Sequence, residues 1–248
     1  MSKKILLKFR RELKVLANQD TRAWFEAYMK YREHYIGVKL PVVEKLITST
    51  VKDLGQSELE ELWPLFMRQR YTEEKLAGMI IYQKKLLSSV NERWKSDLTA
   101  IHDLTQEGHI SWWNTCDWMC IRVLSRMLSH GDEQNKQRIA RAIAGWIKSD
   151  NLWLRRMSLV SFVNHAKHGD VLFLGAQKLV LATAAELVRS TERFHQTAVG
   201  WVIREVYKGD TSVAEKFIST HIQYFSREGL RYAIEKMPTN KRKKYLTW

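Results

Sequence analysis

The sequence predicts an all-α protein. Apolar residues recur at spacings of three and four from one end of the chain to the other, and no run alternates with period two for long. Glycine and proline are scarce, with 11 Gly and 3 Pro among 248 residues, whereas a many-stranded sandwich or barrel needs many turn residues. We therefore expect about 13 helices joined by short polar links.

Apolar stripes locate the first helices. They are expected over residues 5–16, 42–54 and 59–66. Pro41 suits the first turn of the second of these helices, and Ser57 with Glu60 has the spacing of a capping box at the start of the third. Later helices are expected after the candidate caps Asp132, Asp150 or Asn151, Thr191 and Ser226.

Two similar phrases in the second half indicate stacked helix pairs. AIAGWIKSD at 142–150 resembles AVGWVIREV at 198–206, as in repeats that bury their faces only against neighbours. We expect an α-solenoid of HEAT-like helix pairs, with a compact bundle as the alternative. The chain is then a single repeat domain over 1–248 with a concave groove for an extended partner, and a basic tail at about 238–248 carries KRKK.

The charge balance points to a polyanion. Lysine and arginine outnumber the acids by 41 to 27, which gives a net charge of +14 and a pI of about 9.8. Such a field favours nucleic acid over acidic small molecules. Cys116 and Cys120 fall on one helix face and have no distant partner cysteine, which favours a reducing compartment. With no signal peptide and no long apolar run, we expect a cytoplasmic protein that does not bind membranes.

The segment SWWNTCDWM at 111–119 is the most unusual in the chain. Trp113 and Asp117 are four residues apart, so on a helix an indole face and a carboxylate could address one ligand. The alternative interpretation is that Trp112 and Trp113 are core anchors, and that Asp117 complements the helix dipole.

An aromatic residue precedes an arginine by three positions at two further places. These pairs are Trp153 with Arg156 and Trp201 with Arg204. Arginine makes bidentate bonds to phosphate, and tryptophan offers a π face to a cation or a sugar edge. The alternative is a tryptophan between helices beside a solvated arginine.

The sequence gives little support for a metal site or for other catalytic motifs. The metal-like spacing of His165, His168 and Asp170 is more typical of a solvated turn than of a metal site. The chain carries no Gly-rich phosphate loop, no nucleophile elbow and no zinc-deaminase signature. No metal and no cofactor is expected.

Four segments together resemble the AlkD-type DNA alkylation repair glycosylases, whose HEAT-like repeats wrap a DNA duplex. SWWNTCDWM is similar to that family's active-site stretch, SDNLWLRR (149–156) to its phosphate-contacting helix, and FHQTAVGWVIRE (194–205) to its third active-site helix. AYMKYREHYIGVKLPVVEKL (27–46) is similar to an early helix pair, and 57–105 is matched only by pattern.

The resemblance implies roles for seven residues. Catalytic roles fall to Asp117 as the carboxylate and to Trp113 and Trp201 as aromatic walls. DNA contacts fall to Arg156 as a phosphate clamp, and to Arg204, Tyr28 and Phe194. Asn114 stands where a relative has an acid. This difference implies a change in helix capping or in the local electrostatic field, and it leaves the catalytic position, Asp117, intact.

The implied activity is that of a monomeric, monofunctional DNA glycosylase in base excision repair. It would hydrolyse the N-glycosidic bond of positively charged N3- or N7-alkylated purines, such as 3-methyladenine and 7-methylguanine, in double-stranded DNA. One alternative is a non-catalytic HEAT-repeat protein that binds DNA or branched DNA, and another is a scaffold for an acidic protein. The intact Trp-x-x-x-Asp pattern favours the enzyme.

Overall fold

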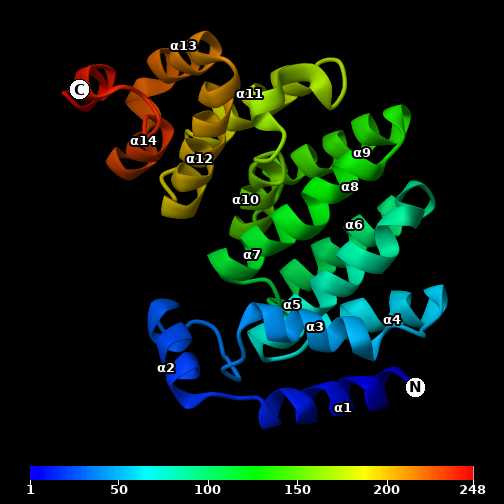
Figure 1. Cartoon of the computed structure of the whole chain (residues 1–248). Coiled ribbons are helices and arrows are strands. Elements are labelled where there is room, and N and C mark those ends of the chain that lie inside the picture. Colours follow the sequence, from blue (N-terminus) through cyan, green and yellow to red (C-terminus); the bar gives the residue numbers. More distant parts are fainter. Residues whose placement is uncertain (248) are drawn as a thin grey trace. The chain divides into compact units, whose positions relative to one another are not determined.

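The computed structural model describes residues 1–247, and the elements within that range are helical apart from one isolated bridge between His34 and Tyr71. The predicted all-α class is therefore confirmed. The chain divides into two compact units, Met1–Arg126 and Met127–Trp248, each with its own core (Figure 1). One continuous repeat domain with a concave groove remains a prediction.

Unit 1 is built around a central helix, α5, which packs on α3, α4 and α7 (Figure 1). Every residue of α5 except Lys75 is buried. Phe9 of α1 meets Phe66 of α4 edge-on, with ring centroids 5.2 Å apart. The elements are α1 (Ser2–Val15), α2 (Gln19–Tyr28), α3 (Leu40–Thr50), α4 (Gln56–Met67), α5 (Thr72–Ile81), α6 (Val90–Gln106) and α7 (Trp113–Met119), with the π-helical turns η1 (Tyr82–Leu86) and η3 (Cys120–Leu124) and the 3-10 turn η2 (Leu87–Ser89).

Unit 2 is organised around the long helix α12, which packs against α10, α11, α13 and α14 (Figure 1). Short helix α8 (Ser125–His130) spans the boundary between the units. The further elements are α9 (Glu133–Gly145), α10 (Leu152–Val160), α11 (Ala176–Leu187), α12 (Arg193–Gly209), α13 (Thr211–His221), α14 (Arg227–Ala233) and α15 (Thr239–Leu246), with the 3-10 turns η4 (Trp146–Lys148), η5 (Ala166–Val171) and η6 (Ile222–Tyr224).

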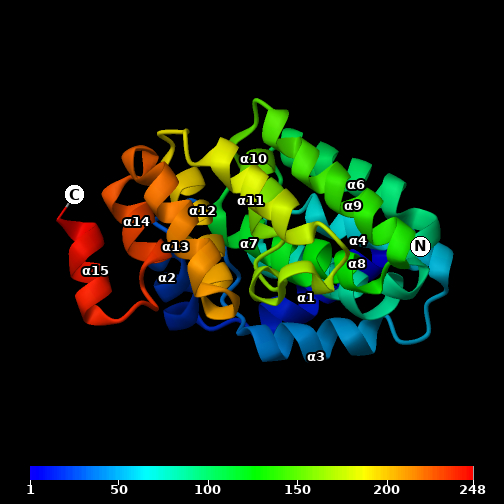
Figure 2. The same cartoon turned by 90° about the horizontal axis from the view of Figure 1, so that it is seen from above.

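The predicted basic tail contains helix α15, which Figure 2 labels near the C-terminus. Lys241 pairs with Glu215 of α13, and the Arg227 guanidinium donates to the Leu246 carbonyl at 2.6 Å. The last residue of the predicted tail, Trp248, lies outside the described residues. Within residues 1–247 no helix combines the length and apolar character needed to cross a membrane.

Two of the predicted caps are confirmed. Asp132 accepts from the Asn135 N–H at 2.8 Å, and Ser226 accepts from the Gly229 N–H at 3.0 Å. Of the two candidates at the start of α10, Asn151 is the cap, and Asp150 is not.

Pro41 lies in the first turn of α3 as predicted, but two other expected starts are displaced. Glu192, one residue after Thr191, precedes α12. The capping box at Ser57 and Glu60 is wrong, because α4 starts earlier and the Gly55 N–H donates to Glu58 at 3.0 Å. Several polar residues near each start could serve as caps, so spacing alone leaves the register open by one or two residues.

Helices α12 and α14 cross closely enough that a methyl group does not fit at Gly200. A Cβ there would lie 2.3 Å from the Gly229 carbonyl oxygen and 2.6 Å from the Tyr232 Cβ. The glycine therefore sets how closely α14 packs on the helix that carries Trp201.

We predict that Gly200→Ala lowers the free energy of unfolding by about 1–3 kcal/mol, because overpacking forces α14 away from α12. Gly145→Ala is the matched control, since a Cβ at that end of α9 meets no atom within 4 Å. It should leave stability unchanged or raise it by up to about 1 kcal/mol. Urea denaturation measures both variants, and equal stability of Gly200→Ala and wild type would contradict the close crossing.

Candidate active site

Helix α7 carries Trp113 and Asp117 one turn apart, as the spacing predicts. Trp113 is half-buried, and Asp117 is only 8% exposed. Tyr28, at the end of α2, meets Trp113 edge-on with ring centroids 6.1 Å apart and an interplanar angle of 77°. Three of the seven predicted site residues thus lie close to one another in unit 1.

A buried carboxylate, Glu33, fixes the first turn of α7. It is 7% exposed and accepts hydrogen bonds from the Asn114 Nδ2 at 3.2 Å and the Thr115 hydroxyl at 2.5 Å. It also accepts from the Tyr35 hydroxyl at 3.0 Å, and Asn114 Nδ2 donates to the same hydroxyl at 3.1 Å. The residues after Trp113 are therefore tied to the segment that follows α2.

The pKa of Tyr35 is shifted in the direction that preserves its hydrogen bond to Glu33. Burial, together with the Glu33 charge, raises the pKa of Tyr35, so its hydroxyl stays protonated and donates. Burial lowers the pKa of Lys75, and the attraction of Glu33 opposes this shift. The Lys75 ammonium donates to the His109 carbonyl at 2.6 Å, close before the start of α7.

A second buried carboxylate, Glu73 at the start of α5, holds the same segment from the other side. It accepts from the backbone N–H groups of Ile36, Gly37 and Val38 at 2.8 to 3.1 Å. Burial raises the pKa of Glu73, and these donors oppose the rise. Gly37 is required here, because its φ is +102° and a Cβ would lie 2.4 Å from the Asn18 carbonyl oxygen.

In unit 2, α10 and the start of α12 bring Trp153, Arg156 and Phe194 together. The rings of Trp153 and Phe194 have centroids 5.0 Å apart. Arg156 is 4% exposed, and its Nη1 donates to the Phe194 carbonyl and to the Thr197 hydroxyl at 3.2 Å. Arg156 therefore links two helices, so the alternative of a solvated arginine is wrong at this position, and its contact with phosphate stays a prediction.

Helix α12 presents Phe194, Trp201 and Arg204 along its less buried face, while its other face is buried. Arg204 is held by two carboxylates: Nη1 donates to Glu235 at 2.6 Å, and Nε and Nη2 donate to Glu205 at 3.2 and 3.1 Å. A phosphate that contacts Arg204 must compete with both acids.

The buried face of α12 is anchored by His195 and its partners. His195 Nε2 lies 3.0 Å from the Leu152 carbonyl oxygen, and Nδ1 lies 2.8 Å from the Ser190 hydroxyl. Burial lowers the pKa of His195 below its ordinary value. The imidazole therefore joins α12 to the start of α10 as a neutral group, with no positive charge placed in the core.

The predicted site residues thus form two groups. Tyr28, Trp113 and Asp117 belong to unit 1, and Arg156, Phe194, Trp201 and Arg204 belong to unit 2. The sequence model of the family described as "DNA alkylation repair enzyme" matches residues 9–237. The chain belongs to the DNA alkylation repair enzyme family.

A solved structure has a fold similar to that of this chain. The chain is similar to a protein described as a predicted DNA alkylation repair enzyme from Enterococcus faecalis, with a TM-score of 0.67 and 15% identity, over 90% of this chain and 97% of that one. At that identity the likeness shows the fold, and it supports the all-α, solenoid-like class. No curated protein matches the chain.

Glu33 and Glu73 are the residues that sequence reasoning missed in this member of the DNA alkylation repair family. Glu33 lies 81 positions from its partner Asn114, so no local spacing connects the two. Glu73 has the pattern of an ordinary first-turn acid that complements the helix dipole. Only its burial, with 3% of the residue exposed, distinguishes it.

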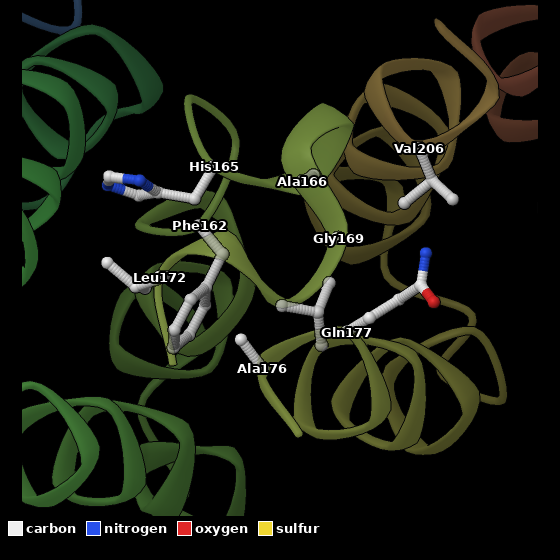
Figure 3. Close-up of a pocket in the computed structure, with 9 residues that line it drawn as sticks. Phe162, His165, Ala166, Gly169, Leu172, Ala176, Gln177 and Val206 are labelled. Carbon is white, nitrogen blue, oxygen red and sulfur yellow. The ribbon is translucent and has the colours of Figure 1, made fainter. Parts of the chain in front are cut away.

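The metal-like cluster of His165, His168 and Asp170 does not form a metal site in the part of the chain that the structure describes. Within residues 1–247 no group of three or more His, Cys, Asp or Glu residues could hold a metal ion, and Asp170 accepts from the Gln177 N–H at 2.8 Å. A cavity of about 10 Å³ beside Phe162 and Gln177, drawn in Figure 3, has room for about one water molecule.

The structure explains Asn114 as a donor to Glu33, which leads to a prediction. Asn114→Asp places a second carboxylate against Glu33, so at pH 7 the free energy of unfolding should fall by about 1–3 kcal/mol. Two adjacent carboxylates share a proton, which raises the pKa of the folded pair. The loss should therefore be small near pH 4 and grow as the pH rises towards 7.

A double variant sharpens this test. Glu33→Gln combined with Asn114→Asp exchanges the acid and the amide, and it should recover most of the stability that the single change loses. Asn240→Asp on exposed α15 is the control and should change little at any pH. Chemical denaturation at several pH values gives the comparison, and a single variant as stable as wild type at pH 7 rules out the buried contact.

Proposed function

We propose that the chain is a DNA glycosylase that hydrolyses the N-glycosidic bond of positively charged N3- and N7-alkylated purines in duplex DNA. The observation that carries the proposal is the pairing of Trp113 with the buried carboxylate of Asp117 on α7. Membership of the DNA alkylation repair family supplies the setting. The implied role is to start base excision repair of alkylated DNA.

The chemistry follows from charge. An N3- or N7-alkylated purine already carries a positive charge, so it leaves without a general acid. As the glycosidic bond breaks, positive charge develops on the deoxyribose, in a transition state of the kind that carboxylates stabilise in glycoside hydrolysis. The Asp117 carboxylate opposes that charge and orients a water molecule for attack at the sugar.

Burial makes this stabilisation effective. Asp117 is only 8% exposed. Its carboxylate therefore acts through surroundings of lower dielectric constant than water, and its attraction for a developing cation is larger. The anchored first turn of α7 holds the carboxylate in place before the reaction, and the indole face of Trp113 one turn away adds cation–π attraction that grows as the sugar becomes cationic. The family resemblance assigns Trp201 of unit 2 the same kind of role.

The remaining residues would hold the DNA. Tyr28 beside Trp113 and Phe194 beside Trp153 would offer aromatic surface to the DNA, and Arg204 would exchange a carboxylate partner for a backbone phosphate. Arg156 would contribute positive charge at the start of α12. We expect the protein to act as a monomer in the cytoplasm on alkylated duplex DNA, with a net charge of +14 that draws it to the phosphates.

Replacing the carboxylate is the direct test. Asp117→Asn should keep binding to duplex DNA and lower single-turnover release of 7-methylguanine by about 10²–10³-fold, the scale of losing one preorganised electrostatic group. Asp103→Asn, at an exposed carboxylate on α6, is the matched control and should excise at the wild-type rate. Unchanged excision by Asp117→Asn would falsify the proposed mechanism, and wild-type protein that binds DNA but releases no base is a non-catalytic binder.

The charge argument also predicts lesion selectivity. If the enzyme mainly stabilises the sugar cation, excision should follow the charge of the lesion more closely than its shape. Duplexes with 7-methylguanine or 3-methyladenine should lose the base, and neutral hypoxanthine should stay in place. Chromatographic detection of free bases gives the measurement, and release of hypoxanthine as fast as 7-methylguanine points to a base-reading pocket instead.

A further inference from the structure

Helix α2 buries none of its ten residues. It is joined to α1 and α3 by non-helical segments (Figure 1), and the Asn18 side chain caps it by accepting from the Thr21 N–H at 2.8 Å. Its largest apolar side chains face solvent, with Trp24 59% and Tyr28 57% exposed. Exposed aromatic surface of this size on a soluble protein is typical of a binding site.

The two exposed rings are already stacked on each other. Trp24 and Tyr28 are parallel within 7°, with centroids 5.1 Å apart, and Phe25 meets Trp24 edge-on at 5.1 Å. A shallow cavity of about 390 Å³ lies against Trp24 and is lined also by Asp20, Thr21, Phe25 and Lys39. That volume is within the range of small-ligand pockets, and its largest wall is an indole.

Two lysines near these rings outnumber Asp20, the one acid that lines the same cavity, so the local charge suits an anion. Lys30 follows α2 closely in the sequence, and Lys39 is the N-cap residue of α3 that lines the cavity beside Trp24. Both are exposed, and neither forms an ion pair within residues 1–247. The backbone between them is unusual, because Lys30 and Tyr31 have φ of +53° and +56°. Left-handed conformations at non-glycine residues are costly and cluster at functional sites, and Tyr31 is 73% exposed.

A flat aromatic platform with free ammonium groups fits a nucleotide whose base is not already stacked. Bases inside a duplex cover one another, whereas bases of a single strand offer both faces to aromatic side chains. We propose that the Trp24–Tyr28 platform binds unpaired bases of single-stranded DNA, with Lys39 contacting the backbone phosphate. This goes beyond the proposed excision of alkylated purines, because it concerns undamaged single strands and requires no bond cleavage.

The test uses the full chain and two probes of equal charge. One is a fluorescent oligothymidylate of about 12 nucleotides, and the other is an oligomer of the same length whose sugars carry no bases. Wild type should bind the thymidylate more tightly than the abasic strand. Trp24→Ala should weaken thymidylate binding about 5- to 100-fold, the range for losing one stacked base, and leave binding of the abasic strand unchanged.

Matched variants separate stacking from charge and from folding. Trp24→Phe should recover part of the affinity, since a smaller ring still stacks. Trp94→Ala is the control, because Trp94 of α6 is also partly exposed beside a lysine, with Lys95 Nζ 5.5 Å from its ring centroid. Lys39→Gln should weaken both probes about equally and lower the salt dependence of binding, whereas Lys45→Gln on α3 should not.

The outcomes are decisive in either direction. A loss at Trp24 that is confined to the strand with bases supports the platform. Equal binding of both probes by wild type, or unchanged thymidylate binding by Trp24→Ala, overturns it. Cosedimentation with anionic phospholipid vesicles that depends on Trp24, without a base-dependent loss, overturns it in favour of a membrane surface. Because no arm measures excision, failure here leaves the glycosylase proposal standing.

Discussion

The buried carboxylate of Glu33 is the contact on which the geometry around α7 depends. A carboxylate out of water is stable only when its oxygens are satisfied by donors, and here a hydroxyl, an amide and a phenol supply them. Loss of any one donor leaves charge uncompensated in the core. The network therefore has few alternative arrangements, and it holds the first turn of α7, which carries Trp113 and leads to Asp117.

The segment between α2 and α3 is held in the same way. Glu73 receives three backbone N–H groups that a sheet or helix would otherwise satisfy, and so a non-helical stretch lies buried against the central helix α5. In unit 1, Glu73 thus satisfies backbone N–H groups that a helix or sheet would satisfy elsewhere, and Glu33 fixes the same segment through side-chain hydrogen bonds. Helix α2 lies outside this core, with Trp24 and Tyr28 exposed and Phe25 stacked on Tyr35.

In unit 2, buried polar side chains fix the position of the long helix α12. Helix α12 is anchored on its buried face by His195 and Gln196, whose amide nitrogen donates to the carbonyls of Val188, Ser190 and Tyr224. These bonds lie on the side of α12 away from Trp201 and Arg204, so none of them uses the less buried face. Two predicted DNA contacts are nonetheless engaged by the protein itself: Arg156 of α10 donates to the start of α12, and Arg204 of α12 donates to two acids.

The sequence by itself determined the all-α class, the family and the placement of Trp113 and Asp117 on one helix face. These features are local, because helical periodicity and four-residue spacing follow from the geometry of one helix. Tertiary structure alone decided that Glu33 meets Asn114, that Arg156 is buried between two helices, and that Trp24 is exposed. Each of these depends on segments far apart in the chain, and nothing in one segment's periodicity encodes which distant carboxylate or carbonyl will be its partner.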